Sequence, residues 1–160
     1  MNDNEPLRVH AIMRTEVFRV GMDATLGQAM AVCLQHRIRH LPVVDSGERL
    51  VGLVTDRDMR VFISHRLGTI MENGSDRESL HRHVHIMMVR RLVTVKPETT
   101  VGEAAYLMLQ RNVGCLPVVD QDYRLIGIIT TSDLLNLLAE DPAPGEPAPR
   151  EGEQAAAVPQ

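Results

Sequence analysis

Two segments of this chain place a threonine and an aspartate at the same spacing after an apolar run, GLVTDRD at 52–58 and GIITTSD at 127–133. We expect each segment to leave a buried strand and enter the first turn of a helix, where free backbone N–H groups favour a phosphate. The threonine hydroxyl can add a hydrogen bond to that phosphate, and the aspartate can accept hydrogen bonds from ribose 2′- and 3′-hydroxyls. The candidate ligand contacts are therefore Thr55 with Asp58 and Thr130 with Asp133.

The same pairs have an alternative role that needs no ligand. A threonine before the first helical residue, with an acidic residue in the first turn, caps a helix and stabilises it by about 1 kcal/mol. Recurrence of the pattern does not separate the two interpretations, because a duplication copies structure and function alike. Arg57 stands beside the expected phosphate, where it either pairs with the phosphate or is a solvated surface arginine, and Ser132 takes its place in the second segment.

An internal repeat positions both segments. When the sequence is shifted by 75 residues, 13–64 align with 88–139 without a gap, and 17 of the 52 aligned positions are identical. Chance does not produce that identity over so long a stretch, so the chain holds two copies of one unit. Each copy reads as β-α-β-β-α, with a capping box at the start of its first helix and continuous apolar runs for its later strands.

The predicted elements of the two copies correspond in pairs: extended runs at 17–20 and 92–95, helices that follow Thr25 and Thr100, hairpin turns at 45–47 and 120–122, and final helices at 57–63 and 132–138. One unit of about 50 residues buries too little surface to be stable alone. We therefore predict an α/β (α+β) fold in which two repeats pack sheet to sheet with pseudo-twofold symmetry. Its expected segments are repeat 1 at 8–64, a linker at 65–83, repeat 2 at 84–139 and a disordered Pro-rich tail at 140–160.

The runs LPVVD at 41–45 and 116–120, each followed by G-h-h-T-x-x-D (h, apolar), resemble the CBS-domain family, specifically a stand-alone tandem CBS pair (Bateman module). The resemblance covers roughly residues 8–139. It implies a disc-like pair that often dimerises, with two clefts that bind AMP, ADP, ATP, S-adenosylmethionine or a related adenosyl ligand, none of them obligatory. Because both copies keep the full T-x-x-D, neither cleft is excluded.

The resemblance also implies adenine-contacting strand residues beside the two threonine–aspartate pairs. They are Ile38, His40, Leu41, Pro42, Val113, Cys115, Leu116 and Pro117. The two prolines shape a strand edge first and line a pocket second. Because Arg39 and His40 become Gly114 and Cys115 in the second copy, we expect the first half to suit an anion better.

Charge and composition argue against several other classes. The net charge of −4 arises from Glu140 onward, and the preceding residues carry 16 acidic and 16 basic side chains, so no basic face for nucleic acid is expected. No apolar run approaches the roughly 20 residues that span a bilayer, and no signal peptide is recognisable. With two cysteines and no C-x-x-C, the simplest expectation is a soluble cytoplasmic protein without membrane contact.

The remaining reactive side chains do not form a recognisable catalytic or metal site. His81, His83 and His85 alternate among arginines that repel a cation, so we interpret them as linker surface. Cys33 is expected in the core, and Cys115 is expected to line a cleft, where a redox role is the minor alternative. No Ser-His-Asp, Walker or G-x-G-x-x-G pattern occurs in a suitable context, so no enzymatic activity is predicted.

The leading hypothesis is a non-catalytic regulatory module. An adenosyl ligand would bind between the repeats and change their packing, and a partner protein would respond to that change. The expected assembly is a homodimer. The alternative is a constitutive dimerisation or interaction scaffold with empty clefts, in which T-x-x-D only caps helices.

Overall fold

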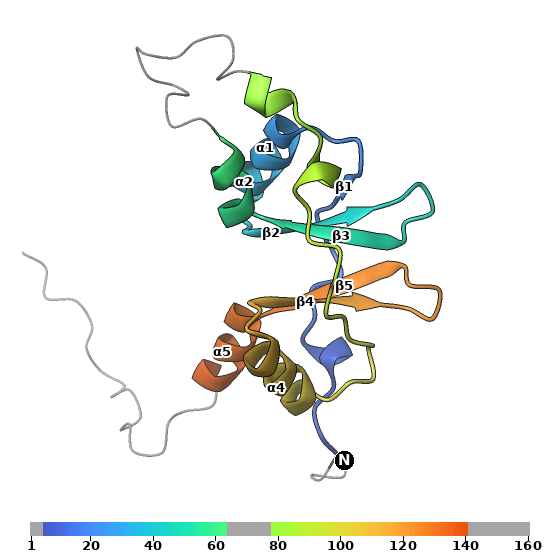
Figure 1. Cartoon of the computed structure of the whole chain (residues 1–160). Helices are drawn as coiled ribbons and strands as arrows, with labels where there is room; N and C mark the ends of the chain where they lie inside the picture. Colours follow the sequence, from blue (N-terminus) through green and yellow to red (C-terminus); the bar gives the residue numbers. More distant parts are fainter. Residues whose placement is uncertain (1–4, 64–77, 141–160) are drawn as a thin grey trace, which may run out of the picture.

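The computed structural model describes residues 5–63 and 78–140, and the two copies lie one above the other (Figure 1). The first copy contains β1 (Val20–Gly21), α1 (Leu26–His36), β2 (His40–Val44), β3 (Leu50–Thr55) and α2 (Asp56–Phe62). The second contains α4 (Val101–Arg111), β4 (Cys115–Val119), β5 (Leu125–Thr130) and α5 (Thr131–Glu140). Short 3₁₀ turns precede each copy: η1 (Val9–Ala11) before the first, and η2 (Ser79–His81) and η3 (Val84–Ile86) before the second. The predicted α/β (α+β) fold is confirmed.

The first helix of each copy begins and ends as the repeat predicts. Thr25 Oγ1 accepts from the backbone N–H of Gln28 at 3.2 Å, and Gln28 Oε1 accepts from the backbone N–H of Thr25 at 2.9 Å. Thr100 and Glu103 form the same capping box in α4. The predicted helix starts are confirmed, and the final helices begin one residue earlier than expected, at 56 and 131.

The predicted first strands are too long. β1 holds only Val20 and Gly21, which pair in parallel with Val43 and Val44 of β2. In the second copy the strand shrinks to a single bridge between Val95 and Val118. The preceding β-prone residues are used differently, since Val17 and Leu92 pack their side chains against an apolar cluster between the sheets.

Both hairpin turns form where the sequence predicts them. Asp45 Oδ1 accepts from the backbone N–H groups of Gly47 at 2.8 Å and Arg49 at 2.9 Å, which is an Asx turn. Asp120 does the same in the second copy with the backbone of 122 and 124. These turns join β2 to β3 and β4 to β5 in antiparallel pairs.

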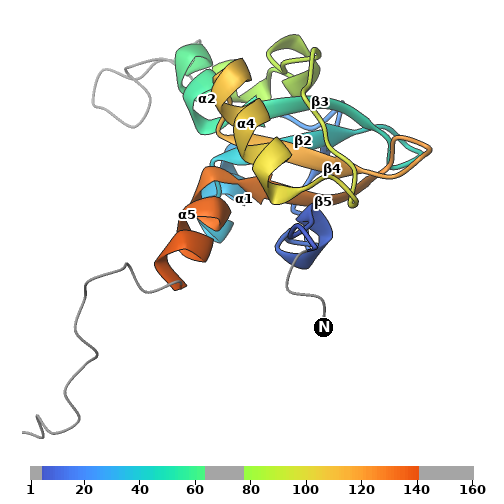
Figure 2. The ribbon, with the colours of Figure 1, turned by 90° about the horizontal axis from the view of Figure 1, so that it is seen from below.

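A buried cluster joins the two sheets. Val44, Leu50, Val119 and Leu125 form a buried cluster with two members from each copy. Beside it the backbone N–H of Leu50 donates to the carbonyl of Tyr123 at 3.0 Å, and its counterpart Leu125 donates to Glu48 at 3.1 Å. The hairpins therefore lie side by side at one end of the strands, with α1, α2, α4 and α5 gathered at the other end (Figures 1 and 2). The predicted sheet-to-sheet packing is confirmed.

The segment before each copy packs into the other copy, an exchange that the repeat alone does not predict. Val9 belongs to the core of the second copy, and Val84, Met87 and Met88 belong to the core of the first. In Figure 1 residues 5–11 lie beside the second copy, and residues 78–86 lie beside α1. This exchange carries residues 14–18 across the space between the copies.

The glycine that opens each G-h-h-T-x-x-D segment makes room for the exchanged chain. A Cβ on Gly127 would lie 2.7 Å from Sδ of Met13 and 3.2 Å from the carbonyl oxygen of Arg14. A Cβ on Gly52 would likewise overlap Met88, the counterpart of Met13. The motif glycine is thus required by close packing.

Some predictions fall outside the structure. The Pro-rich tail beyond residue 140, and the linker through residue 77, lie outside the described residues. Within 5–63 and 78–140, no helix has both the length and the apolar character needed to cross a bilayer.

Candidate functional site: the cleft between the copies

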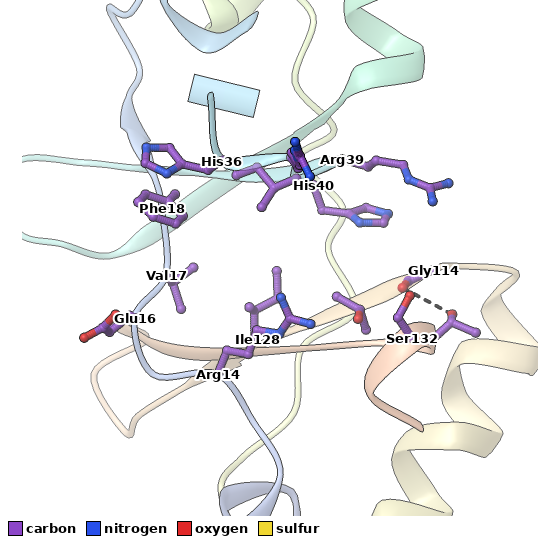
Figure 3. Close-up of a pocket in the computed structure, with 14 residues that line it drawn as sticks. Arg14, Glu16, Val17, Phe18, His36, Arg39, His40, Gly114, Ile128 and Ser132 are labelled. Atoms are coloured by element: carbon purple, nitrogen blue, oxygen red, sulfur yellow. Dashed lines mark hydrogen bonds between the residues drawn. The ribbon is translucent and has the colours of Figure 1, made fainter. Parts of the chain in front are cut away.

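A cavity of about 410 Å³ lies between the two copies (Figure 3). Four pieces of chain line it: the exchanged segment 14–18, residues 36–40 where α1 ends and β2 begins, residue 114 before β4, and residues 128 and 130–132 where β5 ends and α5 begins. Figure 3 shows Phe18, His36 and His40 on one wall and Ile128 and Ser132 on the other. The cleft is therefore a composite of both copies.

The predicted ligand residues divide between this cavity and the protein interior. Ile38, His40 and Thr130 line the cavity. The strand residues of the prediction are buried: Leu41, Pro42, Cys115, Leu116 and Pro117. Val113 packs against the core of the second copy. Thr55, Arg57, Asp58 and Asp133 are not among the residues that line this cavity.

The cavity combines residues of the first copy with the threonine of the second. Arg39 and His40 belong to the first copy, as Arg57 does, and they line the cavity that contains Thr130 of the second copy. The physical reason is that β2 begins at the interface between the copies, so its first residues face across it. Arg14 and Arg37 also line this cavity and add positive charge.

The second threonine–aspartate pair is fully engaged by the protein. Oδ2 of Asp133 accepts from the backbone N–H of Thr130 at 2.7 Å and from its hydroxyl at 2.6 Å. Oδ1 accepts from Arg14, from Nε at 3.0 Å and from Nη2 at 2.9 Å. With this carboxylate only 9% exposed, both of its oxygens are occupied.

The first pair has the same local geometry without the arginine. Oδ2 of Asp58 accepts from the backbone N–H of Thr55 at 3.2 Å and from its hydroxyl at 2.7 Å. The backbone N–H of Asp58 donates back to Thr55 Oγ1 at 3.1 Å, which completes a capping box at the start of α2. Within the part of the chain that the structure describes, no group donates to Oδ1 of Asp58.

His40 lines the cavity beside Gly114 and has a pKa shifted by its surroundings. A Cβ at position 114 would lie 3.3 Å from His40 Nε2, so the ring packs closely against Gly114 and a larger residue there would push it aside. Burial lowers the pKa of His40, and Arg39 adds to the lowering, whereas the carboxylates of Asp56 and Asp58 oppose it. A neutral imidazole near neutral pH can accept a hydrogen bond from a ligand or become charged when an anion enters.

The aromatic wall of the cavity is a feature that the sequence reading missed. The rings of Phe18 and His36 stack with centroids 3.6 Å apart and an angle of 17° between planes. Both side chains reach the cavity wall from outside the repeated motif, Phe18 from the exchanged segment and His36 from the last residue of α1. Phe18 is the only aromatic residue in segment 14–18, and the sequence shows this. Its place in the cavity wall could not be predicted, because it depends on the exchange of segments between the copies.

The cysteines and the alternating histidines occupy structural positions. Burial raises the pKa of Cys115 to about 12, and burial with the nearby Asp56 raises that of Cys33 to about 11, so both are neutral thiols. The rings of His83 and His85 stack, and each Nδ1 hydrogen-bonds to a carbonyl of the segment before α1. Among the residues that the structure describes, no cluster of three or more His, Cys, Asp or Glu side chains could hold a metal.

Comparison with known proteins identifies the repeated unit. The family model of the CBS domain matches twice, at residues 9–65 and 82–140. The chain belongs to the CBS domain family. A CBS domain-containing protein of Dictyostelium discoideum is 41% identical over 140 residues, which is 85% of this chain and 95% of that protein.

Solved CBS pairs share the fold of this one. CBSX2, solved in complex with AMP, matches with a TM-score of 0.70 and 26% identity, over 84% of this chain and 98% of that one. The CBS domain pair of MJ0100, solved with 5′-methylthioadenosine and S-adenosyl-L-methionine, matches with a TM-score of 0.71 and 24% identity, over 86% of this chain and 99% of that one. In larger relatives the chain spans a small part: it covers 24% of the homoserine O-acetyltransferase of Methanohalobium evestigatum, at 30% identity.

Proposed function

We propose that this CBS pair is a non-catalytic regulatory module that binds a phosphorylated adenosine ligand between its copies. The observation that carries the proposal is the composite cleft, in which three arginines and a half-buried histidine surround the start of a helix. Its volume of about 410 Å³ falls within the range of about 300–1,000 Å³ usual for small-molecule sites. The AMP complex of CBSX2, a protein 26% identical to this chain, supports adenosine as the ligand class.

The cavity offers a distinct environment to each part of such a ligand. Arg14, Arg37 and Arg39 supply planar guanidinium groups, which suit phosphate oxygens better than a lysine ammonium does. Thr130 lies at the end of β5 with its hydroxyl beside the first turn of α5. Val17, Ile38 and Ile128 give the apolar surface that a base requires. AMP, ADP and ATP are the candidates that fit these arginines, and S-adenosylmethionine, which has no phosphate, is kept as the comparison ligand of the adenosyl class.

Regulation would follow from the position of the ligand across both copies. Because one cavity wall belongs to the first copy and the other to the second, a ligand that contacts both changes the free energy of their relative packing. A partner protein can read that change only to the extent that the ligand binds the two arrangements with different affinity. We propose a homodimer as the assembled form, with the exposed leucines of the helices buried by a second copy: Leu34, Leu109, Leu135 and Leu138.

One observation favours the alternative of a scaffold with empty clefts. Both threonine–aspartate pairs already hydrogen-bond within the chain, and Asp133 is also paired with Arg14, so neither pair needs a ligand for its own stability. This alternative predicts that nucleotides do not stabilise the protein.

Thermal denaturation and calorimetry with AMP, ADP, ATP and S-adenosylmethionine separate the two functions. A true ligand at 100 times its dissociation constant stabilises the folded state by about 2.7 kcal/mol. Arg39→Gln, in the cavity, should weaken binding, whereas Arg82→Gln, an exposed arginine that does not line the cavity, should not. Absence of any stabilisation by all four compounds would leave only the scaffold.

A further inference from the structure

Positions 14 and 89 are equivalent in backbone structure but carry different side chains. The N–H and carbonyl of Arg14 exchange hydrogen bonds with Ile128 of β5, at 3.0 Å in both directions. The N–H and carbonyl of Val89 exchange the same bonds with Leu53 of β3, at 2.8 and 3.0 Å. Since both pairs are related by the 75-residue shift of the repeat, each T-x-x-D segment has one such position bonded to the strand before it.

The side chain at position 14 or 89 decides whether the aspartate of the neighbouring T-x-x-D segment is paired with an arginine. In both copies Oδ2 accepts from the threonine N–H and hydroxyl, so Oδ1 is the oxygen that remains for a ligand. Arg14 holds Oδ1 of Asp133 with two nitrogens at 2.9 and 3.0 Å, whereas valine at position 89 has no donor to offer Oδ1 of Asp58. The two carboxylates are thus presented differently to any ligand.

We propose that Arg14 is a specificity-determining residue that restricts the Asp133 cleft to anionic ligands. The inference rests on the proposed function and adds a selection rule to it. A ribose that reaches Oδ1 of Asp133 must displace the guanidinium, which breaks a charge-assisted contact to a carboxylate that is only 9% exposed. A neutral nucleoside offers the displaced arginine no new partner. A ligand with a phosphate does, because Arg14 also lines the cavity.

The geometry permits this displacement. The Arg14 side chain is 56% exposed, so it can leave Asp133 without a rearrangement of the core. Its backbone is fixed by the two bonds to Ile128, which keeps the released guanidinium at the cavity wall. Val89 imposes no such requirement at Asp58, so any adenosyl ligand that reaches Asp58 should bind in neutral and anionic forms with a smaller difference in affinity.

The test compares AMP with adenosine by calorimetry in the full chain. An Asp58→Ala background confines ribose recognition by these aspartates to Asp133. Within it, Arg14→Val installs the residue of the other copy, and Arg14→Gln removes the charge while keeping a polar side chain. Both should lower the preference for AMP over adenosine by about tenfold, because one charge-assisted contact is lost to AMP and one barrier is removed for adenosine. Arg82→Val, an exposed arginine away from the cavity, is the matched control and should leave the preference unchanged.

The outcomes distinguish the selection rule from the proposed function. If the Asp58→Ala protein binds AMP and both Arg14 variants keep its preference for AMP over adenosine, the selection rule is overturned while ligand binding stands. If the unsubstituted protein binds neither AMP nor adenosine, the proposed function fails, and the selection rule fails with it. The reverse change supports the rule independently: Val89→Arg in an Asp133→Ala background should raise the preference for AMP over adenosine.

Discussion

Gly127→Ala probes the link between the exchanged segment and the cleft. The added Cβ would lie 2.7 Å from Sδ of Met13 and 3.2 Å from the carbonyl oxygen of Arg14, both closer than ordinary contact. Met13 is flexible and can retreat, but the carbonyl of Arg14 is fixed by its partner Ile128. Overpacking of this kind costs about 1–3 kcal/mol. At about 2–4 °C per kcal/mol for a chain of this size, the midpoint of thermal unfolding should fall by roughly 2–12 °C.

Two further variants make the test specific. Gly102→Ala is the matched control, because a Cβ there meets nothing within 4 Å and the residue lies in the exposed first turn of α4. It should stabilise the protein by up to about 1 kcal/mol. Met13→Ala should restore part of the loss in the Gly127→Ala background, which a double-mutant cycle in urea measures as a coupling free energy. Equal stability of Gly127→Ala and the control, or a coupling of zero, would refute the reasoning about close packing.

Three other predictions concern protonation and capping. The pKa of His40 in the folded protein is lowered from 6.5, so between the two pKa values the unfolded chain binds a proton that the folded chain does not. The free energy of unfolding should therefore fall as pH drops below about 6.5 and level off below the folded pKa. In urea unfolding, the His40→Gln variant should lose this pH dependence. Thr25→Ala and Thr100→Ala should each destabilise by about 1 kcal/mol in the same assay, since each removes half of a capping box, and no change in either would contradict the capping geometry. Cys33 and Cys115, with pKa values raised to about 11 and 12 by burial, should resist a thiol reagent at pH 8 in the folded protein and react fully in denaturant; rapid reaction of the native protein would contradict their burial.

Much of the fold could be predicted because the relevant signals are local and occur twice. The capping boxes at Thr25 and Thr100 and the Asx turns at Asp45 and Asp120 each depend on residues within four positions of one another. The first strands were predicted too long because β-branched residues such as Val17 can bury a side chain between sheets without pairing their backbone.

The composition of the cleft could not be predicted, because it depends on contacts between distant parts of the chain. Arg14 contacts Asp133 across 119 residues, and no pattern in the sequence marks position 14, where the two copies differ. The identity of Met13 and Met88 was visible in the repeat, but only the structure relates them to Gly127 and Gly52 of the opposite copies. For the same reason the sequence does not show that Arg39 of the first copy and Thr130 of the second line one cavity.

The central claim is that a phosphorylated adenosine binds between the two copies. Amide NMR spectra of the full chain during a titration with AMP test it most directly. The account predicts saturable shifts for residues on both walls, with Thr130 and Ser132 from the second copy and Arg39 and His40 from the first. Shifts confined to surfaces away from these walls, or no shifts at millimolar AMP, would contradict it.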